Sequence, residues 1–375
     1  MHIPTEILLA IIEGLADDRP TLLCLLLVSR RFNALALPPL YETISFLIYS
    51  IYFKKQLAAV ECLCRDIETN PGVRFTTAFF FEYKSFSKPR EEAISQAHLL
   101  ITRILPHLPN LRNLLVDFIS THAVDPAILR LLPPTARLTH LYLDCGRYSK
   151  ASFLQNIVLL PTLEDIGVPE FYPRGAETQA IKLSHKELPN LRSLTLSVEN
   201  SLLFDNLHSL DSLIITSDSI SSFVKPEFAF HHLSEAFASI RILVLHCAST
   251  NTLASLLSSF LNLQYMSILD APLSPSQAHD LGVILSKATN IELKGIQFGY
   301  SMGYDIAPFA QTLFGPMKHL VVIVWKSGES VWRLDRGLKT AVPTPVQDNY
   351  KNQWEPMLQA VEDYGEFTRI VNVFV

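Results

Sequence analysis

Residues 188–196 read LPNLRSLTL, a proline-led turn followed by leucines at spacings of three and two. The leucines form the pattern L-x-x-L-x-L, which returns along most of the chain with conservative exchanges. Alternation within such a pattern is typical of a strand with one buried face. The sequence therefore predicts a series of short strands, with pattern instances starting at Phe75, Leu111, Leu138, Leu163, Leu191, Leu210, Ile240, Leu263, Ala288 and Met317.

Helical signals lie between these strand signals. Asp125 and Pro126 begin one segment and Ser274 begins another, while residues 306–314 carry apolar side chains at helical spacing. The units average about 26 residues, which is within the range of leucine-rich repeats. Because neither element of so short a unit can bury its apolar face alone, neighbouring units must stack. The pattern resembles degenerate leucine-rich repeats and predicts an α/β fold, an irregular solenoid over residues 70–325.

The composition excludes several classes of protein. Of 375 residues 49% are hydrophobic, which is enough for sizeable cores and excludes general disorder. Charged residues make up 18%, with a formal net charge of -5, so we expect no nucleic-acid partner. The excess of 23 prolines over 13 glycines is explained by prolines that open the repeated turns.

The cysteines and the apolar runs bear on the compartment. The five cysteines are scattered without disulfide or zinc spacing, which indicates reduced core thiols. The N-terminus carries Glu6 in its first apolar run, unlike a secretory signal. The uncharged run 242–269 is interrupted by costly polar groups, so we expect no membrane span. We expect an intracellular protein, cytoplasmic or nuclear or both.

The first forty residues differ from the repeats and predict three short helices. The first follows Pro4 and ends near Gly14, and the second begins at Asp18. The third spans residues 29–37 and is expected to end at the following proline pair. So small a unit cannot bury all of its leucines internally, so the surplus must meet another surface.

This segment resembles an F-box of the fungal type over residues 2–41. The resemblance rests on about ten positions in the right order, which are IPTEI at 3–7, Ile11, Leu15, the pattern L-x-x-L-x-x-V-S-R-R-F at 22–32 and LY at 40–41. Ile3 replaces the usual Leu and Phe32 the common Trp, and both exchanges remain apolar.

The resemblance implies a partner and a role. F-box families dock onto the Skp adaptor of a cullin–RING ubiquitin ligase and hold a protein substrate for ubiquitination. No catalytic residue, metal or cofactor is then expected in this chain, because the family contributes proximity. The docking residues carried over from the motif are Pro4, Ile7, Leu8, Ile11, Leu25, Val28 and Phe32.

Two further segments complete the expected organisation. Residues 42–69 should link the F-box, residues 1–41, to the repeats, with an amphipathic helix from Lys54 to Asp66 that covers the first repeat. Residues 326–375 should form a loop-rich excursion and a C-terminal cap, with a last strand over 370–375.

The substrate should meet the face of the strands that points away from the leucine core. Residues between and just after the last two leucines of each pattern form a row of mixed charge with one aromatic anchor. The expected substrate-binding residues are Asp117, Tyr142, Asp144, Thr195, Ser197, Ile214, Thr216, His246, Ser267, Glu292 and Lys294.

Two alternatives remain open. In one, residues 1–41 only cap a leucine-rich-repeat scaffold that has no ligase role. In the other, the G-x-S-x-G sequence at 299–303 supplies a serine hydrolase with Ser301 as nucleophile. The second lacks a good partner set, since the only later histidine is His319 and only Asp305 lies between. Histidine spacing also gives no metal site.

Overall fold

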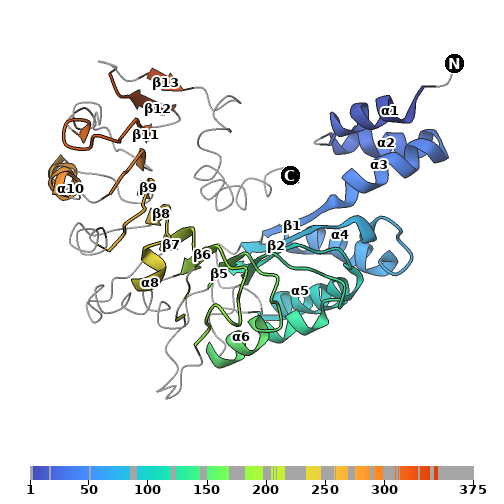
Figure 1. The fold of residues 1–375 in the computed structure, drawn as a ribbon. Coiled ribbons are helices and arrows are strands. Elements are labelled where there is room, and N and C mark those ends of the chain that lie inside the picture. The colour runs from blue at the N-terminus through green and yellow to red at the C-terminus, as the bar shows by residue number, and fades with distance from the viewer. Residues whose placement is uncertain are drawn as a thin grey trace. The chain divides into compact units, whose positions relative to one another are not determined.

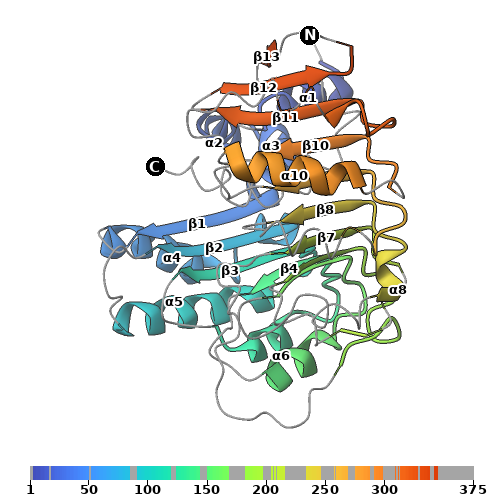
Figure 2. The same ribbon diagram turned by 90° about the vertical axis from the view of Figure 1, so that its left-hand side faces the viewer.

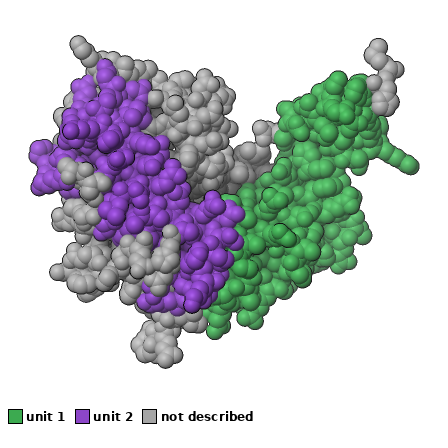
Figure 3. All heavy atoms as spheres, viewed as in Figure 1, with its two compact units in different colours: residues 1–163, 171–174, 367–375 green, residues 164–170, 175–366 purple. Residues whose placement is uncertain are grey.

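The structure, a computed structural model, divides into two compact units (Figure 3). Unit 1 comprises residues 1–163, 171–174 and 367–375, and unit 2 comprises residues 164–170 and 175–366. The structure describes residues 3–344 apart from 17, 50–51, 85–90, 120–123, 144–149, 169–181, 197–203, 206, 208, 216–233, 246–256, 258, 269–274, 288–290, 299–308, 310, 312, 328–329 and 338–341.

Unit 1 begins with the three expected helices, α1 (Thr5–Glu13), α2 (Arg19–Val28) and α3 (Arg30–Glu42) (Figure 1). Helix α2 starts where the sequence indicates, because the Asp18 carboxylate accepts the Thr21 backbone N–H at 3.1 Å. The N-terminal part of the chain is therefore helical, and the rest of unit 1 is mixed α/β.

Helix α3 does not end at its proline pair as expected. It continues through Pro38 and Pro39 to Glu42. Prolines remove two helix donors, which favours an earlier end. The helix continues because Leu40, in its last turn, is buried in the core that the three helices share. Tertiary packing here outweighs local propensity.

Among the described residues of unit 1, four parallel strands follow the helices, each paired with the next along the chain. They are β1 (Thr43–Tyr49), β2 (Ala78–Lys84), β3 (Asn113–Ile119) and β4 (His140–Leu143). Strand β1 was not expected, because the continuous apolar run from Ile44 hides its alternation. The helical elements between and after the strands are α4 (Phe53–Asp66), η1 (Val73–Phe75), α5 (Glu91–Ile104), η2 (Leu105–His107), η3 (Pro126–Leu131) and α6 (Lys150–Ile157).

Unit 2 continues the same sequential pairing in an open sheet. In Figure 2 the labelled strands β7, β8, β10, β11 and β12 follow one another in chain order. The strands are parallel from β5 to β11, and the last two pairings are antiparallel. Its elements are β5 (Asp165–Gly167), β6 (Ser193–Leu196), β7 (Ser212–Ile215), α8 (Ser234–Phe237), β8 (Ile242–Leu245), β9 (Tyr265–Ile268), α10 (Pro275–Lys287), β10 (Gly295–Phe298), β11 (Val322–Ser327), β12 (Ser330–Asp335) and β13 (Val342–Thr344).

The repeated leucines form the core in both units. Leu194, Leu213 and Leu243 are aligned on three adjacent strands and are fully buried. Since residues two apart share a face of a strand, Leu196 extends the same row. The L-x-x-L-x-L pattern therefore marks the buried face that the sequence predicts.

Polar side chains in the turns before the strands donate hydrogen bonds to backbone carbonyls of the preceding repeat. Thr162 Oγ1 donates to the Leu138 carbonyl at 2.7 Å, and Asn110 Nδ2 donates to the Arg74 carbonyl at 2.6 Å. The same kind of bond joins Thr135 to Pro109, Ser209 to Leu191, Ser239 to Leu210 and Asn262 to Ala238. These bonds satisfy carbonyls that the short turns leave outside the strand ladders.

Two of the expected strands start later than the sequence pattern suggests. The pattern that leads into β10 starts at Leu293, although the sequence placed its start at Ala288. The pattern that leads into β11 starts at Leu320, although the sequence placed its start at Met317. Gly295 pairs with both Tyr265 and Val322, which sets this register. The local alternation of Ile291 and Leu293 matched the pattern equally well, so only pairing with neighbours distinguishes the two registers.

The C-terminal part also differs from expectation. Residues 326–344 contain the antiparallel strands β12 and β13 where loops were expected. Arg336 anchors the turn after β12, because its guanidinium donates to the carbonyls of Leu320 and Met317. The expected last strand, over 370–375, lies outside the described residues.

Two further expectations concern cysteines and membranes. Cys64 is buried, as expected of a core thiol, whereas Cys24 and Cys62 are exposed. The other two cysteines lie outside the described residues. Among the helices of the described part, none combines the length and apolar composition needed to cross a bilayer.

Candidate functional site

The three N-terminal helices share one small core. Ile12 of α1, Leu22 of α2 and both Ala36 and Leu40 of α3 are buried in it. The partly buried side chains packed around these four are Leu15, Leu25, Leu26, Phe32, Leu35 and Tyr41. One face of each helix therefore packs against the other two helices, and only the remaining faces are available to a partner.

Side-chain hydrogen bonds hold the helices in this arrangement. The Ser29 hydroxyl accepts the Phe32 backbone N–H at 3.2 Å and begins α3. Arg31 Nη2 donates to Thr5 Oγ1 at 2.7 Å, which joins α3 to α1. Asn33 Nδ2 donates to the Leu26 carbonyl at 3.2 Å, which satisfies an otherwise unpaired carbonyl near the end of α2.

A set of large apolar side chains remains exposed on the outside of α1 and α2 and, at Ile3, just before α1. We call it the exposed apolar set. Leu27 is 89% exposed and Ile7 is 52% exposed. The complete set is Ile3, Ile7, Leu9, Ile11, Leu23, Leu27 and Val28. Apolar side chains gathered in this number on a unit of three helices are typical of an interaction surface.

The predicted docking residues divide into three groups. Pro4, Ile7, Ile11 and Val28 are exposed. Leu25 and Phe32 are half-buried and pack against the helical core. Leu8 is only 4% exposed, so in this structure its side chain supports α1 from inside and is not available to a partner.

Four members of the exposed apolar set were not among the predicted docking residues: Ile3, Leu9, Leu23 and Leu27. The signal that could have found two of them was in the sequence, because α2 is apolar all round and its buried side is occupied by Leu22. The leucines opposite that side must then face outward.

The helical unit is joined tightly to the strands of unit 1. Arg19 Nη2 donates to the Thr43 carbonyl at 2.6 Å, and Asn70 Nδ2 donates to the Tyr41 hydroxyl at 2.9 Å. Thr76 Oγ1 donates to the Tyr41 carbonyl at 2.9 Å. A Cβ on Gly72 would overlap the Tyr41 ring, so only glycine permits this close approach.

Two charged groups at the start of α2 have shifted pKa values. Hydrogen bonds from the Thr21 hydroxyl and then from the Thr21 backbone N–H hold the pKa of Asp18 below its usual value. Burial lowers the pKa of the Arg19 guanidinium, because leaving water disfavours the charged form. Arg19 stays protonated at neutral pH all the same, since its ordinary pKa is far above 7.

The row expected to bind substrate is only partly described. Asp144, Ser197, Thr216 and His246 lie outside the described residues. Asp117 and Tyr142 are half-buried, while Glu292 and Lys294 are exposed but precede β10 instead of lying in it. Thr195, Ile214 and Ser267 are buried, so these three do not form a solvent-facing surface.

The reason is that this second face of the strands is itself apolar. Ile214, Ile242 and Val244 form a buried cluster with Tyr265 packed against it. A similar cluster in unit 1 is formed by Ala78, Phe80 and Leu115 with Tyr142. Parallel strands are commonly buried on both faces, which the simple inward-and-outward interpretation of L-x-L overlooked.

The residues suggested for catalysis or metal binding are not brought together among the described residues. Ser301 and Asp305 lie outside the described part, and His319 is exposed just before β11. Within the residues that the structure describes, no three His, Cys, Asp or Glu side chains are grouped as metal ligands would be.

The N-terminal part of the chain is thus a three-helix unit with a shared core and an exposed apolar set. Residues 1–47 match the family model described as F-box-like, so the N-terminal domain is F-box-like. None of the curated proteins compared with this chain matches it.

Several solved structures are similar to the chain, and one of them covers much of its length. It is the crystal structure of a Bacteroides fragilis protein, a structural genomics target, with 16% sequence identity and a TM-score of 0.40. The similarity covers 76% of this chain and 74% of that one. At this identity and TM-score it identifies neither a shared fold nor a shared function.

Proposed function

We propose that this protein is the substrate-recognition subunit of an SCF-type cullin–RING ubiquitin ligase. The F-box-like domain binds a Skp-family adaptor, and through it the cullin, while the strands that follow bind a protein substrate. The chain contributes no catalysis in this proposal and acts in the cytoplasm, the nucleus or both. The observation that carries it is the exposed apolar set on α1 and α2, within the residues that match the F-box-like model.

The energetics of docking support this role. An apolar side chain that moves from water into an interface contributes roughly 1.5–3 kcal/mol. Leu27 and Ile7 would gain most of that contribution only on binding, because both are exposed in the free protein. F-box-like domains generally bind Skp-type adaptors, which gives the surface a partner of known kind.

The proposal for the rest of the chain is a degenerate leucine-rich-repeat solenoid of the kind found in fungal F-box proteins. Two observations support it. Each strand pairs in parallel with the next one along the chain, and side chains in the turns repeatedly donate hydrogen bonds to carbonyls of the preceding repeat. Tyr142 and Asp117 are the half-buried residues of the expected row that the structure describes, and with the four undescribed ones they remain candidates for substrate contact.

The test is co-purification of the full-length chain with a Skp-family adaptor. Ile7→Asp with Leu27→Asp places two carboxylates in the docking surface, and we expect the adaptor to be lost. Leu99→Asp is the matched control, because Leu99 is 59% exposed on α5, outside the F-box-like domain. Adaptor retention by the double variant at wild-type level, with both variants folded, would refute the assignment.

The alternative, a repeat scaffold with a helical cap, is favoured by one observation. Arg19 and Tyr41 bond to elements beyond the helices, as a structural cap would. Deleting residues 1–41 does not separate the two ideas, since removal of these bonds destabilises unit 1 under either. The exposed-residue variants do separate them, because a mere cap predicts no adaptor to lose.

A further inference from the structure

Strand β1 is the first strand of its sheet and has one unpaired edge. It pairs with β2 along its whole length, from Thr43 with Ala78 to Tyr49 with Lys84. No strand pairs with its other edge among the described residues. An unpaired edge presents backbone N–H and C=O groups that can accept a further strand.

The direction of each backbone group follows from the pairing. The Thr77 N–H donates to the Glu42 carbonyl, so the backbone N–H and C=O groups of every second residue after Glu42 are directed toward β2. The backbone groups of the alternate residues are therefore directed toward the free edge, and these residues are Thr43, Ser45, Leu47 and Tyr49. Two hydrogen bonds at that edge agree with this assignment: Arg19 Nη2 donates to the Thr43 carbonyl at 2.6 Å and the Tyr49 N–H donates to Gln56 Oε1 at 2.7 Å.

Arg19 and Gln56 thus occupy the two ends of the free edge, and between them the backbone groups of the edge have no described partner. No described residue bonds to the backbone N–H or C=O of Ser45 or Leu47 on this side. The Ser45 Oγ is also buried without a hydrogen-bond partner in the described chain, and the residue is only 5% exposed. Unpaired polar groups in such a place are costly unless something supplies partners.

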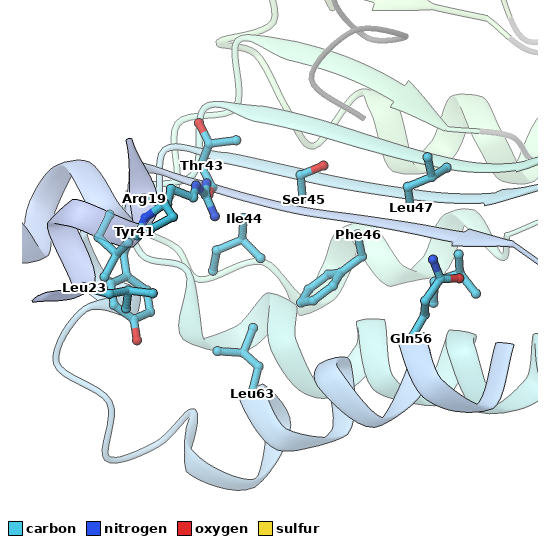
Figure 4. Close-up of a pocket in the computed structure, with 13 residues that line it drawn as sticks. Arg19, Leu23, Tyr41, Thr43, Ile44, Ser45, Phe46, Leu47, Gln56 and Leu63 are labelled. Atoms are coloured by element: carbon cyan, nitrogen blue, oxygen red, sulfur yellow. The ribbon is translucent and has the colours of Figure 1, made fainter. Parts of the chain in front are cut away.

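A pocket of about 570 Å³ runs along this edge (Figure 4). Leu23 and Arg19 of α2 and Leu63 of α4 contribute side chains to its lining, and β1 supplies residues 43–48. Figure 4 shows Ser45 and Leu47 on one side of the strand and Ile44 and Phe46 on the other, above α4. The lining combines apolar side chains with one row of backbone hydrogen-bonding groups.

We propose that this edge groove binds an extended peptide segment of a partner protein, which adds a strand beside β1. The occupant is identified by the hydrogen-bonding groups, because N–H and C=O groups repeated every second residue match an extended backbone. The apolar walls then select its alternate side chains. The filled ends limit the segment to the few residues that fit between Arg19 and Gln56.

The groove overlaps the proposed adaptor-docking surface at one residue, Leu23. Of the exposed apolar set only Leu23 lines it, and Ile3, Ile7, Leu9, Ile11, Leu27 and Val28 do not. Six of the seven residues of the set therefore take no part in the groove. The inference therefore goes beyond the proposed function and does not depend on it.

The test uses displayed random short peptides selected on the immobilised full-length protein, followed by calorimetry with the best synthetic peptide. Ser45→Pro removes the N–H that points to the groove without removing a bond to β2, and edge strands tolerate proline. We expect the Kd to rise about tenfold, the cost of a lost backbone hydrogen bond. Ser45→Ala, the matched control, keeps the N–H and should bind as wild type does.

A second measurement acts on the peptide instead of the protein. In an added strand every second peptide amide faces β1 and the others face away. N-methylation of the amides that face β1 should abolish binding, whereas N-methylation of those that face away should leave binding unchanged. The proposal is overturned if no peptide is enriched, or if both methylated sets bind equally. It is overturned too if Leu27→Asp weakens the selected peptide and Ser45→Pro does not, because the peptide then occupies the helical surface.

Discussion

Leu27 and Leu22 lie on the same helix in opposite surroundings, which lets one experiment separate docking from folding. Leu27 is 89% exposed, and Leu22 is fully buried at 0% in the core that the three helices share. We predict that Leu27→Ala weakens adaptor binding at unchanged stability. Leu22→Ala should lower stability first and affect binding only through unfolding.

The expected magnitudes follow from these exposures. Truncation to alanine removes roughly three carbon groups worth about 0.8 kcal/mol each on burial, so Leu27→Ala should cost about 2 kcal/mol of adaptor affinity. That is about a 30-fold rise in Kd. Leu22→Ala leaves a cavity and should cost roughly 2–5 kcal/mol of unfolding free energy. For a unit of this size that lowers the Tm by several degrees.

The assay is a thermal melt of each full-length variant, followed by titration with a purified Skp-family adaptor below both melting temperatures. Two outcomes would refute the reasoning. One is a drop in Tm for Leu27→Ala as large as that for Leu22→Ala, which would mean that Leu27 is packed inside the protein. The other is tight adaptor binding that Leu27→Ala leaves unchanged.

Three other perturbations have defined outcomes. Burial lowers the pKa of His98, so the unfolded chain binds more protons between that lowered value and the ordinary value near 6.5. The contribution of neutral His98 to the unfolding free energy should be fully present above pH 6.5 and should be lost as the pH falls through the lowered pKa. Thermal melts from pH 7.5 downward should show this loss of stability, and His98→Gln should reduce it. Gly72→Ala should cost about 1–3 kcal/mol by overpacking against the Tyr41 ring, as measured by urea unfolding, and Tyr41→Leu in the same chain should recover part of the loss. Thr162→Val removes the hydroxyl that bonds to the Leu138 carbonyl and should cost about 1 kcal/mol in the same assay; an unchanged midpoint would show that the bond contributes nothing.

The sequence predicted the helices and most strands because their signals are local. The apolar spacing of α1 and the Asp18 cap of α2 depend on neighbours within one turn. The L-x-x-L-x-L pattern likewise marks a strand through the alternation of its own residues. Where two local patterns overlap, as at Ile291 and Leu293, the signal is ambiguous and pairing between strands decides.

The exposed apolar set was predicted in part for a related reason. The motif identified Ile7, Ile11 and Val28, which the structure leaves exposed. It also included Leu8, which is buried, and missed Leu27, which is the most exposed large apolar residue of the described chain. Spacing alone marks which residues of a helix are apolar, but α2 is apolar all round, and only the position of α3 determines which side is covered.

The sequence by itself determined the order of parts: three short helices, then repeated strand units, with apolar side chains in excess on the helices. These follow from periodicities set by side chains a few residues apart. Tertiary structure decided what depends on residues far apart in the chain. It carried α3 through two prolines, buried the second face of the strands and left the β1 edge open beside α2, because each of these depends on which distant element packs there.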